Sequence, residues 1–307
     1  MIWFALVVVL LVAIWSLLHF KTSRPDGRLL PVQPYRQLMF QIMPTRTESV
    51  VYFDVFVRAE KLERYLEQAG TKFGATMTHA TLAASNLCLC AAPRMNRFVL
   101  GRRLYERDGR WLTFTMKRTK LDREAKLSTV KMQMHDGETF PALCARINEH
   151  IGVERSGKRT HADKEFDLFN LLPRPALRGG VGALMVLDYF NLLPGWYIKD
   201  DPLYTSIFVA NLGSLGMRAG FHHLFEYGNC PGFVMVGKVE DVACVEDGKV
   251  VPGRQLHMRV TYDERIDDGL NARLGMDAMV RVLSDPERWL GGVDTEAKAM
   301  WPRSDWE

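Results

Sequence analysis

The sequence lacks the patterns that define several common classes of protein. Its 307 residues include five cysteines, an odd number at scattered positions, and no C-x-x-C pair. Neither a disulfide framework nor a zinc or other metal site is therefore expected, and the free cysteines favour a reducing compartment. The formal net charge is only +4, with no long basic run and no alternation of basic and aromatic residues. We therefore expect no nucleic-acid partner.

Charge is also missing from the start of the chain. Residues 2–20 contain no Asp, Glu, Lys or Arg, and a helix of this length spans roughly 28 Å, close to the hydrocarbon thickness of a bilayer. One alternative is a cleavable signal peptide, but such a peptide has a charged start, a shorter apolar core and a small-residue cleavage site. The other alternative is a buried helix of a soluble protein. We interpret residues 1–20 as a single transmembrane anchor.

Positive charge follows this apolar segment directly. Lys21, Arg24 and Arg28 come after it, and no charged side chain precedes it. Because cytoplasmic flanks are enriched in Lys and Arg, this asymmetry predicts a single-pass membrane protein with its C-terminal body in the cytoplasm. Residues 21–34 are polar and rich in proline, and we interpret them as a juxtamembrane linker.

A single domain is predicted over residues 35–290, followed by a C-terminal tail over residues 291–307, because no comparable break interrupts the chain. Alternating or β-branched segments predict strands, and apolar residues at helical spacing predict helices. The predicted strands are 49–57, 97–105, 111–117, 126–135, 204–212, 232–239 and 256–262, and the predicted helices are 58–69, 76–91, 139–151 and 270–283. This order indicates an α/β fold with a large mixed sheet and covering helices.

A charged motif follows the last predicted strand. Residues 263–269 read Asp-Glu-Arg-Ile-Asp-Asp-Gly. This resembles the D-H-R-x-x-D-G signature of the catalytic domain of 2-oxoacid dehydrogenase acyltransferases, with Glu264 in place of histidine; chloramphenicol acetyltransferase carries a shorter H-x-x-x-D-G form. Further segments resemble the family in the same order along residues 35–290. They are Pro-Arg-Met-Asn at 93–96, Ile-Phe-Val-Ala-Asn-Leu-Gly at 207–213, the apolar strand 231–239 and the helix stop at 283–287.

The resemblance implies a chloramphenicol acetyltransferase-like fold, a homotrimer with its active site between subunits, and chemistry on coenzyme A thioesters. In the family the motif histidine deprotonates a thiol, and a hydroxyl on the N-L-G strand binds the oxyanion. An acidic or amide residue four places after the histidine helps to hold the site together. These three positions are Glu264, Ala210 and Asp268 here, so the histidine and the hydroxyl are both absent. Asn211 and Gly213 match the family and shape the turn.

Glu264 is the remaining candidate for a general base. A carboxylate has a pKa of about 4.3, roughly four units below that of a thiol, although burial can raise it. If the alternation of strand 256–262 continues, Glu264 lies on the buried side of the sheet. Loss of an oxyanion donor typically lowers the rate by a further factor of about 100 to 1,000. The two changes together favour a catalytically impaired relative, a pseudoenzyme.

Other polar residues and glycines are expected to have structural roles. His222 and His223 are adjacent in a loop, which favours surface residues over a relocated base. His79 lies on a predicted helix, where we expect it to be hydrogen-bonded. A solvated hairpin edge is predicted for Arg102, Arg103 and Arg107, and a bend for Gly179, Gly180 and Gly182.

Two classes of function follow from these observations. Residues 1–34 leave no room for a lipoyl domain or a subunit-binding domain, so we expect no lipoyl group and no ordinary role inside a 2-oxoacid dehydrogenase complex. The first class is a non-enzymatic homotrimeric scaffold on the membrane, whose trimers can assemble further into a cage. The alternative is a membrane-tethered, coenzyme A-dependent acyltransferase that uses Glu264 as a remodelled base.

Overall fold

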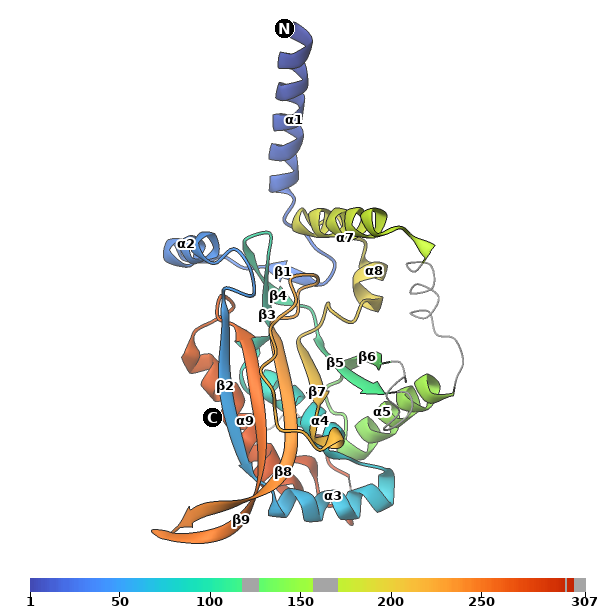
Figure 1. Cartoon of the computed structure of the whole chain (residues 1–307), viewed down its shortest axis with the longest axis vertical. Helices are drawn as coiled ribbons and strands as arrows, with labels where there is room; N and C mark the ends of the chain where they lie inside the picture. The colour runs from blue at the N-terminus through green and yellow to red at the C-terminus, as the bar shows by residue number, and fades with distance from the viewer. Residues whose placement is uncertain (118–126, 157–170, 296, 301–307) are drawn as a thin grey trace.

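A six-stranded mixed sheet forms the centre of the molecule (Figure 1). The computed structural model describes residues 1–117, 127–156, 171–295 and 297–300. The strand order is β2-β9-β8-β7-β5-β6, in which the pairs β5–β7 and β7–β8 are parallel and the other pairs are antiparallel. The strands are β2 (Val50–Arg58), β5 (Arg110–Lys117), β6 (Leu127–Met134), β7 (Ile207–Asn211), β8 (Gly232–Glu246) and β9 (Lys249–Asp263).

Helices pack on one face of this sheet and enclose the main core. Val209, Val236 and Met258 of the central strands are buried together with Leu87 of α4 and Val282 of α9. The helices that contribute to this core are α3 (Glu60–Phe73), α4 (Met77–Ala91), α5 (Phe140–Arg155), α9 (Gly269–Ser284) and α10 (Pro286–Leu290). The expected mixed α/β fold with covering helices is confirmed, and the predicted helices correspond to α3, α4, α5 and α9.

A smaller sheet lies nearer to the N-terminal helix. Its order is β1-β4-β3, formed by β1 (Gly27–Leu29), β4 (Arg103–Arg107) and β3 (Arg97–Leu100). The short 3-10 helix η1 (Pro93–Asn96) precedes β3. Because β1 pairs with β4, part of the segment expected as a juxtamembrane linker is built into the folded body. Helix α2 (Pro34–Ile42) follows and was not predicted.

Helix α1 (Ile2–Phe20) projects away from the body, and its side chains from Trp3 to Trp15 are exposed (Figure 1). By length and composition, its residues Trp3–Phe20 are able to cross a membrane. Helix α7 (Arg174–Tyr189) runs crosswise at the foot of α1, and α8 (Gly195–Asp200) lies below it. Three glycines that were expected to mark a bend lie inside α7, because no proline or cap interrupts the helix there: Gly179, Gly180 and Gly182.

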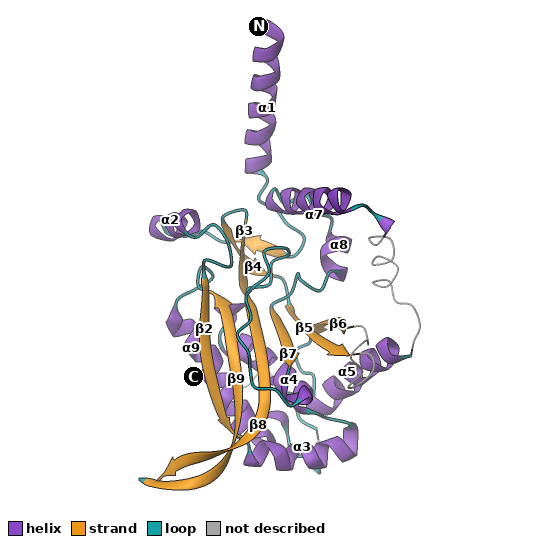
Figure 2. Ribbon diagram, viewed as in Figure 1, coloured by secondary structure: helices purple, strands orange, loops and turns teal. Residues whose placement is uncertain are grey.

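The predicted strands 232–239 and 256–262 are present but longer than expected. β8 and β9 continue as a two-stranded hairpin beyond the sheet, at the end of the molecule opposite α1 (Figure 2). The tail returns to the body as far as Met300, whose backbone N–H donates to the carbonyl oxygen of Glu138. The rest of the predicted tail, residues 301–307, lies outside the described residues.

Candidate functional site

The motif at residues 263–269 forms the turn between β9 and α9. Asp263, at the end of β9, is fully buried. Its carboxylate accepts hydrogen bonds from Ser49 Oγ at 2.9 Å and from Arg265 Nε at 2.9 Å, and its second oxygen lies 2.7 Å from Arg265 Nη2. Arg265 is also buried and donates to the carbonyl oxygen of Met43. These two motif residues therefore hold the turn against the body.

Glu264 points away from the body within a single chain, contrary to the expected buried orientation. β9 ends at Asp263, so the strand alternation does not continue, and Glu264 is exposed in a turn. Its backbone N–H donates to the carbonyl oxygen of Ser49 at 2.9 Å. Its carboxylate makes no hydrogen bond or ion pair with the part of the chain that the structure describes. The position is accessible, but its own chain does not desolvate it.

Asp268 caps helix α9. Its Oδ1 accepts hydrogen bonds from the backbone N–H groups of Leu270 at 3.1 Å and Asn271 at 3.3 Å, which satisfies two donors that the first helical turn leaves free. These bonds, chiefly that from the Asn271 backbone, lower the pKa of the Asp268 carboxyl. The residue is thus a charged N-cap whose role in the described chain is structural.

Positive charge gathers beside the motif around the buried Asp267. Three arginines surround its carboxylate: Arg97 at 3.2 Å, Arg94 at 3.7 Å and Arg36 at 3.8 Å. Burial and the proximity of Arg94 lower the pKa of Arg97, although Asp267 opposes this. Further carboxylates act on two of these arginines: Glu106 on Arg97 and Asp268 on Arg36. These arginines are the residues next to the motif that could hold an anionic group.

Ala210, at the end of β7, has no side-chain donor to offer an oxyanion. The next residue, Asn211, donates from Nδ2 to Thr78 Oγ1 at 3.0 Å and accepts from the Ser214 backbone N–H at 3.1 Å. Gly213 follows, and a Cβ at this position would lie 2.3 Å from the carbonyl oxygen of Gly237. The family-like Asn and Gly therefore shape a tight turn against β8, as expected.

Ala210 and Glu264 are far apart in one chain. Ala210 pairs with Met235 of β8, and Met235 pairs with Arg259 of β9, five residues before Glu264. With about 3.3 Å per residue along a strand and about 4.8 Å between strands, the two positions are separated by roughly 19 Å. A single chain therefore does not bring them into one site.

The histidines considered above have structural surroundings. His79 is 1% exposed, completes a capping box with Thr76 at the start of α4, and contacts Asn148 Oδ1 at 3.2 Å through Nε2. Burial lowers the pKa of His79 to about 4. His222 stacks on Phe233 with ring centroids 3.9 Å apart, and burial lowers its pKa as well. His223 is exposed.

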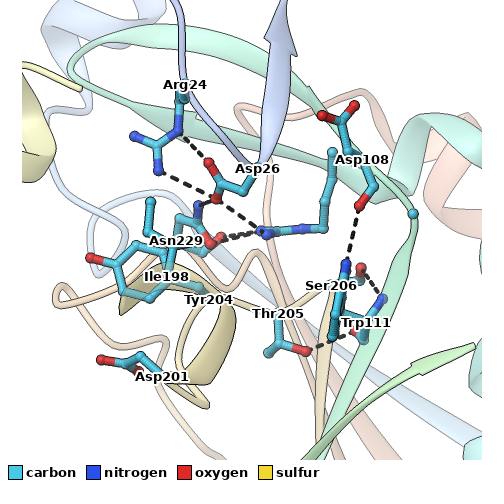
Figure 3. Close-up of polar contacts among 12 residues, drawn as sticks. Arg24, Asp26, Asp108, Trp111, Ile198, Asp201, Tyr204, Thr205, Ser206 and Asn229 are labelled. Atoms are coloured by element: carbon cyan, nitrogen blue, oxygen red, sulfur yellow. Dashed lines mark hydrogen bonds and ion pairs between the residues drawn. The ribbon is translucent and has the colours of Figure 1, made fainter. Parts of the chain in front are cut away.

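A buried polar cluster that the sequence did not reveal lies just after α1. Figure 3 shows Arg24, Asp26 and Asn229 converging: Arg24 Nε donates to Asp26 Oδ1 at 2.7 Å, and Asn229 Nδ2 donates to Asp26 Oδ2 at 2.7 Å. Arg24 Nη1 also donates to Asp188 Oδ1, at the end of α7, at 3.0 Å. Arg107, expected at a solvated hairpin edge, is buried here and donates to Asn229 Oδ1 at 2.8 Å. The charges of this cluster are neutralised by one another.

A cavity of about 210 Å³ lies between α7 and the turn that joins β3 and β4. The charged side chains that line it include Arg46, Asp188 and Arg265. Neither Glu264 nor Ala210 lines this cavity. In the described ranges, no three His, Cys, Asp or Glu side chains lie close enough together to hold a metal ion.

Known proteins resemble this chain in sequence over part of its length and in fold over most of its length. The family model of the 2-oxoacid dehydrogenases acyltransferase catalytic domain matches residues 200–291, from the end of α8 to just beyond α10. That interval contains β7, the motif turn and α9. No curated protein matches the chain.

Solved structures resemble the chain over most of its length. A probable dihydrolipoamide acetyltransferase from Listeria monocytogenes 4b F2365 has a TM-score of 0.56 at 16% identity, covering 88% of this chain and 97% of that chain. The cubic core of the pyruvate dehydrogenase multienzyme complex has a TM-score of 0.55 at 15% identity, covering 85% and 93%. A chloramphenicol acetyltransferase has a TM-score of 0.50 at 12% identity, covering 84% and 99%. The chain therefore has the chloramphenicol acetyltransferase-like fold, which dihydrolipoamide acetyltransferases share.

Proposed function

We propose that this protein is a membrane-anchored, homotrimeric scaffold with an acyltransferase fold and an impaired acyltransferase site. One observation carries the proposal: the motif residues that support the turn are retained, whereas the two reacting positions are replaced. Asp263 and Arg265 form a buried pair, and Asp268 caps α9. Glu264 and Ala210 stand where the family resemblance implies a histidine and a hydroxyl. This pattern fits retention of a fold without its usual chemistry.

The separation of the two positions supports a trimer. Glu264 and Ala210 lie roughly 19 Å apart within one chain, by the strand geometry given above. The family resemblance implies a site between subunits, where the motif turn of one copy faces the N-L-G strand of the next. The exposed Glu264 turn is then a surface that a second copy would cover.

The anchor is α1, whose residues Trp3–Phe20 are not buried by the described body and are able to span a bilayer. The exposed Lys21 and Arg28 follow it. Since Lys and Arg are retained on the cytoplasmic side of a span, we place the body in the cytoplasm.

The full-length chain, purified in detergent, provides the test. Light scattering coupled to size exclusion measures the protein mass, and calorimetry with acetyl-CoA measures ligand binding. We expect the mass of three chains, or a multiple of three, and no detectable binding or acyl transfer to thiol acceptors. A monomeric mass, or turnover in the wild-type chain that Glu264→Gln abolishes, would contradict the scaffold.

The second candidate is a coenzyme A-dependent acyltransferase with Glu264 as its base. The arginines around Asp267 favour it, because guanidinium groups suit the phosphates of a coenzyme A thioester. In this case a neighbouring subunit would have to bury Glu264 and raise its pKa toward that of the thiol. A rate that rises with pH through a single group, and that disappears in Glu264→Gln but not in Asp277→Asn on α9, would favour this candidate.

A further inference from the structure

Helix α7 has an apolar side that no described residue covers. The side chains turned toward the body are Leu177, Leu184 and Asp188, which are buried or half-buried. The opposite side is exposed and uncharged, and Val186 on it is 57% exposed. It consists of Pro175, Ala176, Gly179, Gly182, Ala183 and Val186. A helix on the surface of a soluble body normally places polar residues on this side.

The glycines of α7 show how open this side is. A Cβ added at Gly179, Gly180 or Gly182 would meet no heavy atom within 4 Å apart from the helix's own backbone and chain neighbours. These glycines therefore do not serve close packing within the described chain. They leave a smooth, small-residue surface.

Helix α2 presents a second apolar stripe at a similar level along the long axis of the molecule (Figure 1). Tyr35, Leu38 and Ile42 are 65%, 58% and 63% exposed, and their spacing places them on one side of the helix. Phe40 on the other side is fully buried. The two helices thus flank the foot of α1, each with an unpartnered apolar side.

The end of α1 is fixed to the body at this level. The ring of His19 lies 5.2 Å from that of Phe190, the residue after α7, and Arg103 donates to the carbonyl oxygen of His19. Asn191 Nδ2 donates to the carbonyl oxygen of Lys21 at 2.8 Å. Arg24 is then buried between Asp26 and Asp188. Because the chain is held immediately after α1, the body cannot swing freely away from the plane in which α1 ends.

Exposed basic residues border the two helices. Arg174 and Arg178 lie on α7, Arg102 lies at the β3–β4 turn and contacts Gln41 of α2, and Lys21 follows α1. Basic side chains beside an apolar helix face suit the anionic headgroups of a bilayer surface.

We infer that α7 and α2 lie in the bilayer interface and hold this face of the body against the lipid. The inference rests on the proposed function, because it requires α1 to span the membrane. The geometry favours lipid as the partner of the apolar sides of α7 and α2. α1 brings these helices to the bilayer surface, and the cluster around Arg24 holds the body in that position. The apolar side of α7 is then immersed by about 5–10 Å, the usual depth of interfacial helices.

The test uses the full-length chain in lipid nanodiscs of mixed zwitterionic and anionic lipid. In a Cys244→Ser background the four remaining cysteines, Cys88, Cys90, Cys144 and Cys230, are buried and protected from labelling. Single cysteines then carry an environment-sensitive fluorophore: Ala183→Cys on α7, Leu38→Cys on α2, Leu10→Cys in α1 and Glu67→Cys on the exposed side of α3. Quenching by nitroxides attached to the lipid chains reports immersion, and quenching by a water-soluble nitroxide reports exposure.

We expect the labels at positions 183, 38 and 10 to be quenched from the lipid and the label at position 67 from water. If the label at position 10 is quenched from lipid but the labels at positions 183 and 38 are quenched from water, α7 and α2 do not lie in the interface. The inference then fails, whereas α1 as the membrane anchor is supported. If position 10 is itself quenched from water, the anchor and the inference both fail. A label at position 183 that neither nitroxide reaches indicates a protein partner, such as a second copy, and overturns the inference.

Discussion

Asp263 and Glu264 are adjacent in the chain, but only Asp263 is buried. The difference arises because β9 ends between them, so the side chain of Asp263 points into the body and that of Glu264 points into solvent. The sequence allowed the motif to be located, since its letters and its place after an alternating strand are visible without a structure. It could not reveal where the alternation stops, because that depends on the bond from the Glu264 N–H to Ser49, more than two hundred residues earlier.

Substitutions at Asp263 and Glu264 are expected to distinguish a residue that stabilises the fold from one that stands at the position of the family's catalytic histidine. Asp263→Asn leaves Arg265 buried without its counter-charge and should lower the free energy of unfolding by about 3–5 kcal/mol. Glu264 has no hydrogen-bond or ion-pair partner in the described chain, so Glu264→Gln should change the free energy of unfolding by about 1 kcal/mol or less, even where a second copy covers the turn. Denaturant unfolding in detergent measures both. Equal losses would contradict the view that Asp263, and not Glu264, stabilises the turn.

His79 predicts a pH dependence of stability. Its pKa is about 4 in the folded protein and 6.5 when unperturbed, so between these values the unfolded chain binds a proton that the folded protein does not. The free energy of unfolding should therefore fall as the pH drops from 6.5 to 4, by at most about 3 kcal/mol from this group. The His79→Gln variant, measured by denaturant unfolding at several pH values, should lose this part of the decline. If the free energy of unfolding of His79→Gln depends on pH as that of the wild-type chain does, the prediction is wrong.

Helices and strands with a regular hydrophobic pattern were predictable from the sequence, whereas elements without such a pattern were not. The strand 256–262 and the helices α3, α5 and α9 have one buried side, so their periodicity is visible in the sequence, whereas α4 is buried on all sides and was identified as an apolar run. β1 lies in a proline-containing segment, and what stabilises it is its pairing with a distant strand, β4. α2 is only nine residues long and begins at Pro34. α7 contains three glycines and lacks a polar side, so neither helical propensity nor amphipathic periodicity identifies it.

Glycines in two elements allow a matched comparison. At Gly213 a Cβ would lie 2.3 Å from the carbonyl oxygen of Gly237, so Gly213→Ala must push the turn away from β8. We expect a loss of about 1–3 kcal/mol in unfolding free energy, typical of overpacking. Gly182→Ala, inside α7 and with open space around it, should be neutral or stabilising by up to about 1 kcal/mol. Thermal unfolding of the two variants side by side measures the difference, and comparable losses would contradict this assignment of strain.

At the scale of the whole molecule, the cluster around Arg24 joins the N-terminal helix to the body. Positive charge after an apolar segment predicts topology, and Lys21, Arg24 and Arg28 predict in this way that the body is cytoplasmic. The sequence could not show that Arg24 is withdrawn into the fold, because two of its partners, Asp188 and Asn191, lie more than 160 residues away.

Replacement of Arg24 should loosen this connection. Arg24→Met leaves Asp26 and Asp188 without their shared cation, and we expect a loss of about 3–5 kcal/mol together with faster tryptic cleavage after Lys21. The control is Arg28→Met, because the Arg28–Glu106 pair is largely exposed and is worth about 0–1 kcal/mol. Denaturant unfolding and timed proteolysis in detergent provide the measurements. Identical behaviour of the two variants would mean that the cluster does not hold the foot of α1.

The fixed foot of α1 restricts the symmetry of any assembly. Three copies can all insert α1 into one flat bilayer only if their threefold axis is parallel to the bilayer normal. A closed cage, such as the cubic core to which this fold is similar, contains threefold axes that point in different directions. Anchored trimers could therefore join into such a shell only around a membrane that curves with it, so growth of the assembly would bend the bilayer.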